Sequence, residues 1–238
     1  MKALLLAAGL GTRLRPITYS IPKCLVPING KPLLEYWLDM FYKNEFSFVM
    51  INLHYLSGKV ISYLENSPYR HYVETVHEEK LLGTAGTLLK NKSYFESDTI
   101  FLAHGDNFSI FDMNAFIKAH QSRPSGCEIT MMTFETDTPK SCGVVELDKN
   151  QIVRGFYEKV ENPPGKLANG AVYMLEPSVL DFLVSLEKEE IDFSTEVLPF
   201  FIGRIYTFLN QQYHRDIGSL ESYKIAQKDA LNLCPFSE

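Results

Sequence analysis

Residues 2–16 read KALLLAAGLGTRLRP, and this stretch decides the fold because an apolar run leads directly into a turn with two glycines. The run 2–8 is long enough for a buried strand and too short to cross a bilayer. Gly9 and Gly11 carry no Cβ, so backbone N–H groups of the turn can come close to a phosphate. The stretch therefore predicts a phosphate-binding loop after the first strand of an α/β sheet.

Two well-known phosphate loops do not match this turn. Leu14 stands where a dinucleotide-binding turn needs its third glycine, and no Asp or Glu follows the second expected strand. The Gly-Lys-Ser/Thr of a Walker A loop is also absent. A turn that only ends a strand stays open as an alternative. Arg13 in the loop and Lys23, between Pro22 and Pro27, favour phosphate binding, because fixed cations offset phosphate charge.

The rest of the first half alternates short apolar runs with helical periodicity, which is typical of parallel strands joined by crossover helices. Strands are expected at 2–8, 47–53, 72–77, 99–104 and 128–134, and helices at 33–42, 57–65, 84–90 and 113–120, the last with Asp112 as its N-cap. Later segments indicate a hairpin of 144–147 and 152–156, a loop at 162–165, strands at 171–175 and 204–209, and helices at 178–188 and 219–233. The predicted class is α/β, with a mixed, mainly parallel sheet flanked by helices and an inserted antiparallel hairpin region.

Length and composition limit the function classes. The 238 residues suit one sizeable domain, and 45% apolar with 22% charged residues excludes a disordered chain. The net charge of −6 and the lack of a Lys/Arg run argue against nucleic acid as a partner. No membrane span or secretion signal is expected, which predicts a cytoplasmic protein. The cysteines lack C-x-x-C spacing, so free thiols are expected at Cys24, Cys127, Cys142 and Cys234.

A carboxylate follows another apolar strand. Residues 101–107 read FLAHGDN, and Asp106 stands where open α/β sheets place ligand-binding groups. Mg²⁺ usually takes one or two protein carboxylates together with phosphate oxygens and water. A second carboxylate is therefore expected.

The triplet His214-Arg215-Asp216 imitates a kinase motif, but the downstream Asn and an Asp-Phe-Gly are missing, so a kinase is excluded.

The stretches LAAGLGTRLRPIT (6–18) and PKCLVPINGKPLLEY (22–36) resemble the signature of the sugar-1-phosphate nucleotidylyltransferases, or nucleoside-diphosphate-sugar pyrophosphorylases. The resemblance covers nearly the whole chain and looks closest to mannose-1-phosphate guanylyltransferases. It implies a Rossmann-like fold of the nucleotide-diphospho-sugar transferase type. It also implies one domain over 1–238, with a nucleotide-binding half at about 1–135 and a sugar-phosphate-binding half at about 136–238.

The resemblance also implies roles for individual residues. Arg13, Lys23 and Asp106 match catalytic positions, and Asp216, in YHRDIGS (213–219), matches the second carboxylate, so that Asp106 and Asp216 would hold Mg²⁺. Many members carry Trp two residues before this Asp where this chain has His214, which leaves open whether His214 touches substrate; the role of His104 is open too. Asp216 alone could equally be a helix cap.

Two sets of binding residues follow from the same resemblance. The nucleotide is expected at Leu6, Ala8, Gly9, Gly11, Thr12, Arg13, Glu79, Gly83 and Thr84, and the sugar phosphate at Asn107, Gly143, Glu158, Lys159 and Asn169. As bare patterns, residues 78–88 are a helix start, Glu158-Lys159 a surface pair and Asn169-Gly170 a turn before a strand. The segment DFSTEVLP (192–199) matches the family too, although helix capping by Ser194 explains it equally well.

The predicted activity is Mg²⁺-dependent transfer from a nucleoside triphosphate to a sugar 1-phosphate, giving a nucleotide sugar and pyrophosphate, as in polysaccharide biosynthesis. The Leu-Gly-Thr-Ala-Gly form of residues 82–86 favours GTP with mannose 1-phosphate or manno-heptose 1-phosphate. UTP or dTTP with glucose 1-phosphate, another phosphate acceptor such as phosphocholine, and a non-catalytic nucleotide-sugar-binding regulator are the alternatives. The sequence leaves the oligomeric state open, a homo-oligomer included.

Overall fold

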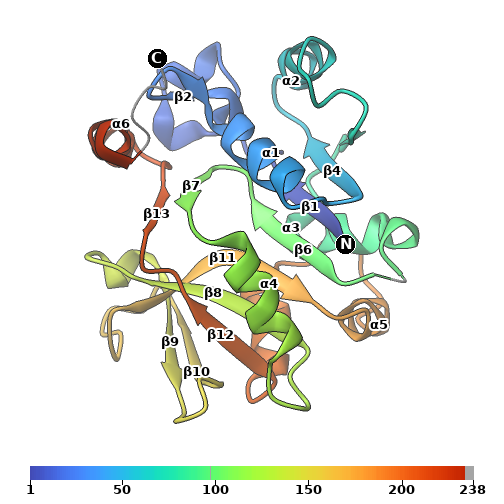
Figure 1. The fold of residues 1–238 in the computed structure, drawn as a ribbon, viewed down its shortest axis with the longest axis vertical. Helices are drawn as coiled ribbons and strands as arrows, with labels where there is room; N and C mark the ends of the chain where they lie inside the picture. The colour runs from blue at the N-terminus through green and yellow to red at the C-terminus, as the bar shows by residue number, and fades with distance from the viewer. Residues whose placement is uncertain (97, 234–238) are drawn as a thin grey trace. The chain divides into compact units, whose positions relative to one another are not determined.

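The computed structural model describes residues 1–96 and 98–233 and has an α/β fold (Figure 1). Its central sheet is mixed and mainly parallel, carries added antiparallel strands and is flanked by helices, which confirms the predicted class. The chain divides into two compact units: residues 1–4, 82–103 and 111–212 form the first, and 5–81, 104–110 and the described residues from 213 onward form the second. The predicted halves are defined by ligand rather than by packing, so they stay a prediction.

The first unit is built around a long strand, β11 (Leu167–Leu175). This strand pairs antiparallel with β6 (Ile100–His104), β8 (Ile129–Glu135) and β9 (Gly143–Leu147). The predicted hairpin is confirmed as β9 with β10 (Val153–Glu158), and β12 (Ile205–Leu209) runs parallel to β8. The helices of this unit are α3 (Gly83–Lys90), α4 (Met113–Gln121) and α5 (Ser178–Ser185).

Helix α4 shows how local sequence sets these elements. The Asp112 carboxylate accepts a hydrogen bond from the Ala115 N–H at 2.9 Å, which confirms the predicted N-cap. Met113, Phe116 and His120, spaced three and four residues apart, form its buried face. Helix α4 lies against β8 and β12 (Figure 1). The Phe116 ring lies 5.3 Å from that of Phe208 in β12.

The second unit contains the end of β1 (Lys2–Leu6) and the parallel strands β4 (Phe48–Leu53) and β5 (Val73–His77). Two short ribbons complete it: β2 (Pro27–Ile28) with β3 (Lys31–Pro32), and β7 (Asn107–Ile110) with β13 (Tyr213–Asp216). Its helices are α1 (Leu33–Lys43), α2 (Ser57–Glu65) and α6 (Leu220–Leu233). One of its cores joins Leu14, Val26, Ile28, Leu33, Phe108, Ile217, Ala226 and Ala230.

Two local predictions, about a turn and a helix cap, are wrong, and one strand pairing was not predicted. Strand β11 begins at Leu167, so Asn169 and Gly170 lie inside a strand and not in a turn; the Asn169 side chain accepts from the Ala171 N–H at 2.9 Å. Asp192, and not Ser194, caps the single turn Phe193–Val197, by accepting from the Thr195 N–H at 2.8 Å. The pairing of β7 with β13 has no counterpart among the predicted elements.

Two predictions about the whole chain can be compared with the described residues. Cys24, Cys127 and Cys142 are free thiols, as predicted, and Cys234 lies outside the described residues. Within 1–96 and 98–233, no helix has both the length and the apolar character that a membrane crossing requires.

Candidate active site

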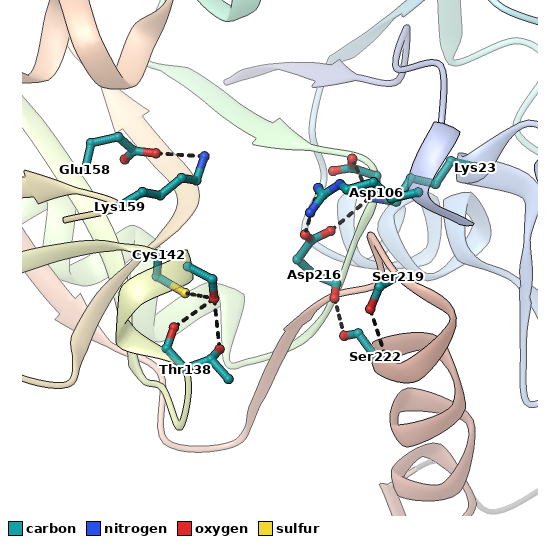
Figure 2. Close-up of polar contacts among 11 residues, drawn as sticks. Lys23, Asp106, Thr138, Cys142, Glu158, Lys159, Asp216, Ser219 and Ser222 are labelled. Carbon is teal, nitrogen blue, oxygen red and sulfur yellow. Dashed lines mark hydrogen bonds and ion pairs between the residues drawn. The ribbon is translucent and has the colours of Figure 1, made fainter. Parts of the chain in front are cut away.

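The second unit brings three predicted residues together around one ammonium group. Lys23 Nζ donates to Asp106 Oδ2 at 2.7 Å and to Asp216 Oδ1 at 2.9 Å (Figure 2). The Lys23 side chain is only 7% exposed, whereas both carboxylates are partly open to solvent. The buried ammonium is therefore held by two carboxylates that remain partly open to solvent.

Three separate segments supply these side chains. Lys23 begins the 3-10 turn Lys23–Leu25, where the preceding Pro22 limits backbone freedom. Asp106 follows Gly105, whose N–H donates to the Leu6 carbonyl at 2.8 Å. A Cβ on Gly105 would lie 3.1 Å from the Leu5 side chain, so glycine allows this close approach.

Asp216 is the last residue of β13 and lies opposite Asn107, the first residue of β7. Its carbonyl accepts a hydrogen bond from the Ser222 hydroxyl of α6, and Ser219 accepts from the Ser222 N–H at 3.2 Å (Figure 2). The chain therefore holds Asp216 from both sides, by a strand pair and by the first turn of a helix.

Opposite charges outweigh burial in this cluster. Burial opposes ionisation of Asp106, but the positive charge of Lys23 more than compensates and lowers the pKa of the Asp106 carboxyl below 3.8. Burial likewise opposes the charge on Lys23, yet Asp106 and Asp216 together raise its pKa above 10.5. The lysine and Asp106 are consequently both charged at neutral pH.

Arg13 adds a second, exposed cation to the cluster. Its guanidinium lies 3.7 Å from Asp216 Oδ2, and its side chain is 75% exposed. A Cβ on Gly218 would lie 2.6 Å from Asp216 Oδ2 and 2.8 Å from the Arg13 guanidinium, so glycine leaves the space that these two groups share. Gly11 has φ +62° and its carbonyl accepts from the Thr18 hydroxyl at 2.7 Å, which fixes the turn that carries Arg13.

The two carboxylates fit Mg²⁺. Both point at a single cation, and carboxylate oxygens are the ligands this hard ion prefers. Among residues 1–96 and 98–233, no group of three or more His, Cys, Asp or Glu side chains could enclose a metal. Mg²⁺ accepts such a sparse set, because phosphate oxygens and water complete its coordination. Asp106 and Asp216 are therefore suited to a metal that arrives with a phosphate ligand.

A buried amide supports the start of the glycine-rich turn, and sequence reasoning missed it. The Ala7 N–H donates to Asn52 Oδ1 at 2.7 Å, and Asn52 Nδ2 donates to Glu78 Oε1 at 3.0 Å. Asn52 and Glu78 are each 3% exposed, whereas Glu79, the predicted base-binding residue, is exposed. A polar residue near the end of an apolar strand, as at Asn52, is the signal that could have found this contact.

The predicted nucleotide-binding residues are divided between the units. Leu6 and Ala8 are buried, while Gly9, Thr12 and Arg13 are exposed.

In the first unit, Gly83 begins α3 with φ +76°, and a Cβ there would lie 2.4 Å from the Ile191 carbonyl oxygen. The Thr84 hydroxyl accepts from the Phe193 N–H at 2.7 Å and donates to Asp192 Oδ2 at 3.3 Å. Residues 192–193 thus hold the start of α3, a role that the sequence left open.

The predicted sugar-phosphate residues of the first unit lie on β9, β10 and β11, except Lys159, which directly follows β10. Glu158 ends β10, and its carboxylate binds the neighbouring Lys159 ammonium at 2.9 Å (Figure 2). A Cβ on Gly143 would lie 2.6 Å from Glu158 Oε2, so glycine makes room for this carboxylate. Asn169 Nδ2 donates to the Tyr173 hydroxyl at 2.6 Å, so this amide nitrogen has a hydrogen-bond partner within the protein. Asn107 belongs to the second unit, where its carbonyl accepts from Trp37 Nε1 at 3.0 Å.

Comparison with protein families and curated proteins finds similarity along nearly the whole chain. Residues 2–232 match the family model described as "Nucleotidyl transferase". A UTP–glucose-1-phosphate uridylyltransferase from Synechocystis is 31% identical, over 98% of this chain and 64% of the relative. A mannose-1-phosphate guanylyltransferase from Mycobacterium tuberculosis is 29% identical, over 93% of this chain and 62% of the relative. The chain thus spans less than two thirds of the length of these two curated relatives.

Solved structures share the fold. The crystal structure of HddC from Yersinia pseudotuberculosis superposes with a TM-score of 0.80 at 26% identity, over 96% of this chain and 98% of HddC. A second HddC structure, complexed with GMP-PN, gives a TM-score of 0.79.

Proposed function

The chain belongs to the nucleotidyl transferase family, and from that premise we propose that it transfers a nucleotidyl group from a nucleoside triphosphate to a sugar 1-phosphate. The observation that carries the proposal is the Lys23 ammonium held between Asp106 and Asp216 in the unit that also contains the glycine-rich turn. Phosphoryl chemistry depends mainly on positioning and on charge neutralisation, and this cluster supplies both.

In the proposed reaction, a phosphate oxygen of the sugar 1-phosphate attacks the α-phosphorus of the triphosphate in line. The bond between the α-phosphorus and the bridging oxygen to the β-phosphorus breaks, and pyrophosphate leaves. Lys23, fixed by two carboxylates, offsets negative charge at the α-phosphoryl group, and the exposed Arg13 binds the phosphates that depart. Both groups act by charge, so no covalent enzyme intermediate is needed.

Asp106 and Asp216 are the residues proposed to hold Mg²⁺. When bound, the ion would supply positive charge that offsets the negative charge of the phosphate groups. The proposal assigns the nucleotide to residues of the glycine-rich turn and of the 78–88 segment, and it assigns the sugar phosphate to Asn107, Gly143, Glu158, Lys159 and Asn169.

The proposed nucleotide is GTP, with mannose 1-phosphate or a manno-configured heptose 1-phosphate as acceptor. Supporting it are the Leu-Gly-Thr-Ala-Gly form of residues 82–86, the guanylyltransferase from M. tuberculosis and the HddC complex with GMP-PN. Guanine offers N1–H and N2–H₂ donors that a carboxylate such as Glu79, or a carbonyl in the Gly83 turn, could accept. Uracil and thymine have one N–H, so an acceptor built for guanine would be left unpaired.

The Synechocystis uridylyltransferase favours a second candidate: the same chemistry with UTP, or with dTTP, and glucose 1-phosphate. A non-catalytic nucleotide-sugar-binding regulator is a third reading. Such a regulator would tolerate loss of Arg13, Lys23, Asp106 or Asp216, and the chain retains all four.

One assay tests these candidates together. Purified protein is incubated with Mg²⁺, each of GTP, UTP, dTTP, CTP and ATP, and a panel of sugar 1-phosphates, and pyrophosphate release is followed. We expect the highest kcat/KM for GTP with mannose 1-phosphate or the heptose 1-phosphate, and Lys23→Ala provides the negative control. A higher kcat/KM for UTP or dTTP would reject the guanylyl assignment and keep the reaction class. Nucleotide-sugar binding without turnover on any pair would instead favour the regulator.

A further inference from the structure

The ribbon of β7 and β13 has a polar face with Ser109 and His214, and an opposite face on which Phe108 and Tyr213 lie with Arg215. In its antiparallel register, Ser109 lies opposite His214 and Asn107 lies opposite Asp216, and residues two apart share a face. Ser109 Oγ and His214 Nδ1 lie 2.6 Å apart in a hydrogen bond. The polar face therefore carries this bond and, two residues further along β13, the carboxylate that binds Lys23.

The opposite face is anchored by other contacts. The Phe108 ring lies 5.0 Å from the Tyr36 ring of α1 and 5.3 Å from the Tyr213 ring. The Tyr213 hydroxyl donates to Asp229 of α6 at 2.8 Å. These contacts attach the ribbon to two helices, but they lie on the face away from the carboxylate.

We propose that the Ser109–His214 hydrogen bond is a register lock that places Asp216 beside Asp106, so that Ser109 and His214 are positioning residues for the metal-binding carboxylates. This inference rests on the proposed function, because it concerns the same Mg²⁺ site.

The shortness of the ribbon makes this bond important. Only four residue pairs define the pairing of β7 with β13, and a slip by one residue would turn Asp216 to the other face. A side-chain bond between directly opposed residues opposes such a slip. Loss of a group hydrogen-bonded directly to a metal ligand typically changes metal affinity by 10–100-fold, and the less direct Ser109–His214 bond is expected to act at the lower end of that range.

The test measures binding of Mn²⁺, an EPR-visible substitute for Mg²⁺, to the protein in the presence of a nucleoside triphosphate and without a sugar 1-phosphate, because the two carboxylates are suited to a metal that arrives with phosphate. Ser109→Ala removes the hydroxyl, and His214→Phe keeps a ring but removes its nitrogens. Each is expected to weaken Mn²⁺ binding about tenfold. The double variant is expected to be no weaker than His214→Phe alone, because that variant has already lost the bond to Ser109. His214→Asn, whose amide places a polar atom where Nδ1 lies, is expected to restore binding to within about twofold of the wild type.

Tyr213→Phe is the matched control, since it removes a hydrogen bond from the same strand on the opposite face. It is expected to change thermal stability but not Mn²⁺ affinity. A purely structural role for Ser109 and His214 would make their variants behave like this control. Unchanged Mn²⁺ affinity in Ser109→Ala and His214→Phe, or additive losses in the double variant, would overturn the inference.

Asp106→Asn and Asp216→Asn, measured in the same titration, separate this inference from the proposed function. If they abolish Mn²⁺ binding while Ser109→Ala does not change it, only the register lock is wrong. If they too bind Mn²⁺ like the wild type, or if the wild type itself binds none, the two-carboxylate metal site is wrong and the register lock is rejected with it.

Discussion

Each compact unit contains a polar cluster around a buried basic side chain, and burial disfavours the charged form of both. The charged form prevails in one cluster and the neutral form in the other. At Lys23, burial would remove the charge, but two carboxylates at 2.7 and 2.9 Å keep the ammonium ionised. At His120, in α4, burial and the charge of Arg123 lower the pKa to about 4, despite a hydrogen bond to Glu176 at 2.9 Å. His120 is 2% exposed, and its other ring nitrogen bonds the Thr130 hydroxyl at 2.8 Å.

The difference teaches how to distinguish a site prepared for a charged ligand from a buried network that supports the fold. The raised pKa of Lys23 and the lowered pKa of Asp106 keep both groups charged across neutral pH. The stabilisation from their pairing is lost only as pH falls below about 3.8 or rises above about 10.5. The neutral His120, by contrast, resists protonation, so its contribution changes within the mildly acidic range. The following predictions are ordered by their expected effect on activity.

The largest effect is expected from Lys23→Ala, which removes the charge that distinguishes the first cluster. Turnover should fall by roughly 10²–10³, the usual scale for one preorganised charge-stabilising group. The fold should persist, because both remaining carboxylates are reached by water. Steady-state kinetics with a thermal unfolding curve checks both points. Near-normal kcat in a folded variant would remove Lys23 from the mechanism.

Asp106→Asn and Asp216→Asn should each lower activity by about 10–100-fold and raise the Mg²⁺ concentration needed for half-maximal rate. Each change removes one anionic ligand from a site that has few. The measurement is a Mg²⁺ titration of initial rates. A variant that matches the wild type across the titration would show that its carboxylate is structural.

Gly218→Ala should lower kcat/KM by about tenfold, because its Cβ would lie 2.6 Å from Asp216 Oδ2 and displace the carboxylate or Arg13. Gly58→Ala in α2 is the control, since its Cβ would meet no atom within 4 Å. Equal activity of the two variants would mean that the space beside Asp216 has no functional importance.

The smallest effect on activity, none at pH 7.5, is expected for His120→Asn, whose consequence is a change in the pH dependence of stability. Unfolded histidine binds a proton near pH 6.5, whereas folded His120 resists protonation to about 4. The free energy of unfolding of the wild type should therefore fall, by at most about 3 kcal/mol, as pH decreases from 6.5 to 4. Urea unfolding at several pH values gives the free energy of unfolding as a function of pH. In His120→Asn, this free energy should fall less between pH 6.5 and 4 than in the wild type. The same pH dependence in both proteins would contradict the lowered pKa of His120.

The sequence predicted the elements with strong periodicity and missed those set by distant pairing. Helix α2 has the predicted bounds, and β4 and β5 are each one residue shorter than expected. Asn169-Gly170 has the composition of a turn, but pairing of β11 with β8 draws it into a strand. Local composition could not predict this outcome, because the partner strand lies more than 30 residues earlier.

The candidate site shows the same limit. Motif resemblance indicated Lys23, Asp106 and Asp216, yet the placement of the ammonium between the carboxylates depends on β13 pairing with β7, about a hundred residues away. Strands of four residues give too little periodicity to predict that pairing. Asn52 and Glu78 were missed for a related reason, since their hydrogen bonds join three separate chain segments.

The most direct test of the central claim follows the phosphorus atoms of the triphosphate. Protein, Mg²⁺ and mannose 1-phosphate are incubated with GTP labelled with ³²P at either the α- or the γ-position, and the products are separated. Attack at the α-phosphorus predicts α-label in the nucleotide sugar and γ-label in pyrophosphate. Lys23→Ala should form both labelled products roughly 10²–10³-fold more slowly. If the γ-label appeared on the sugar or as inorganic phosphate, the protein would be transferring or hydrolysing a terminal phosphoryl group, and the account would be contradicted.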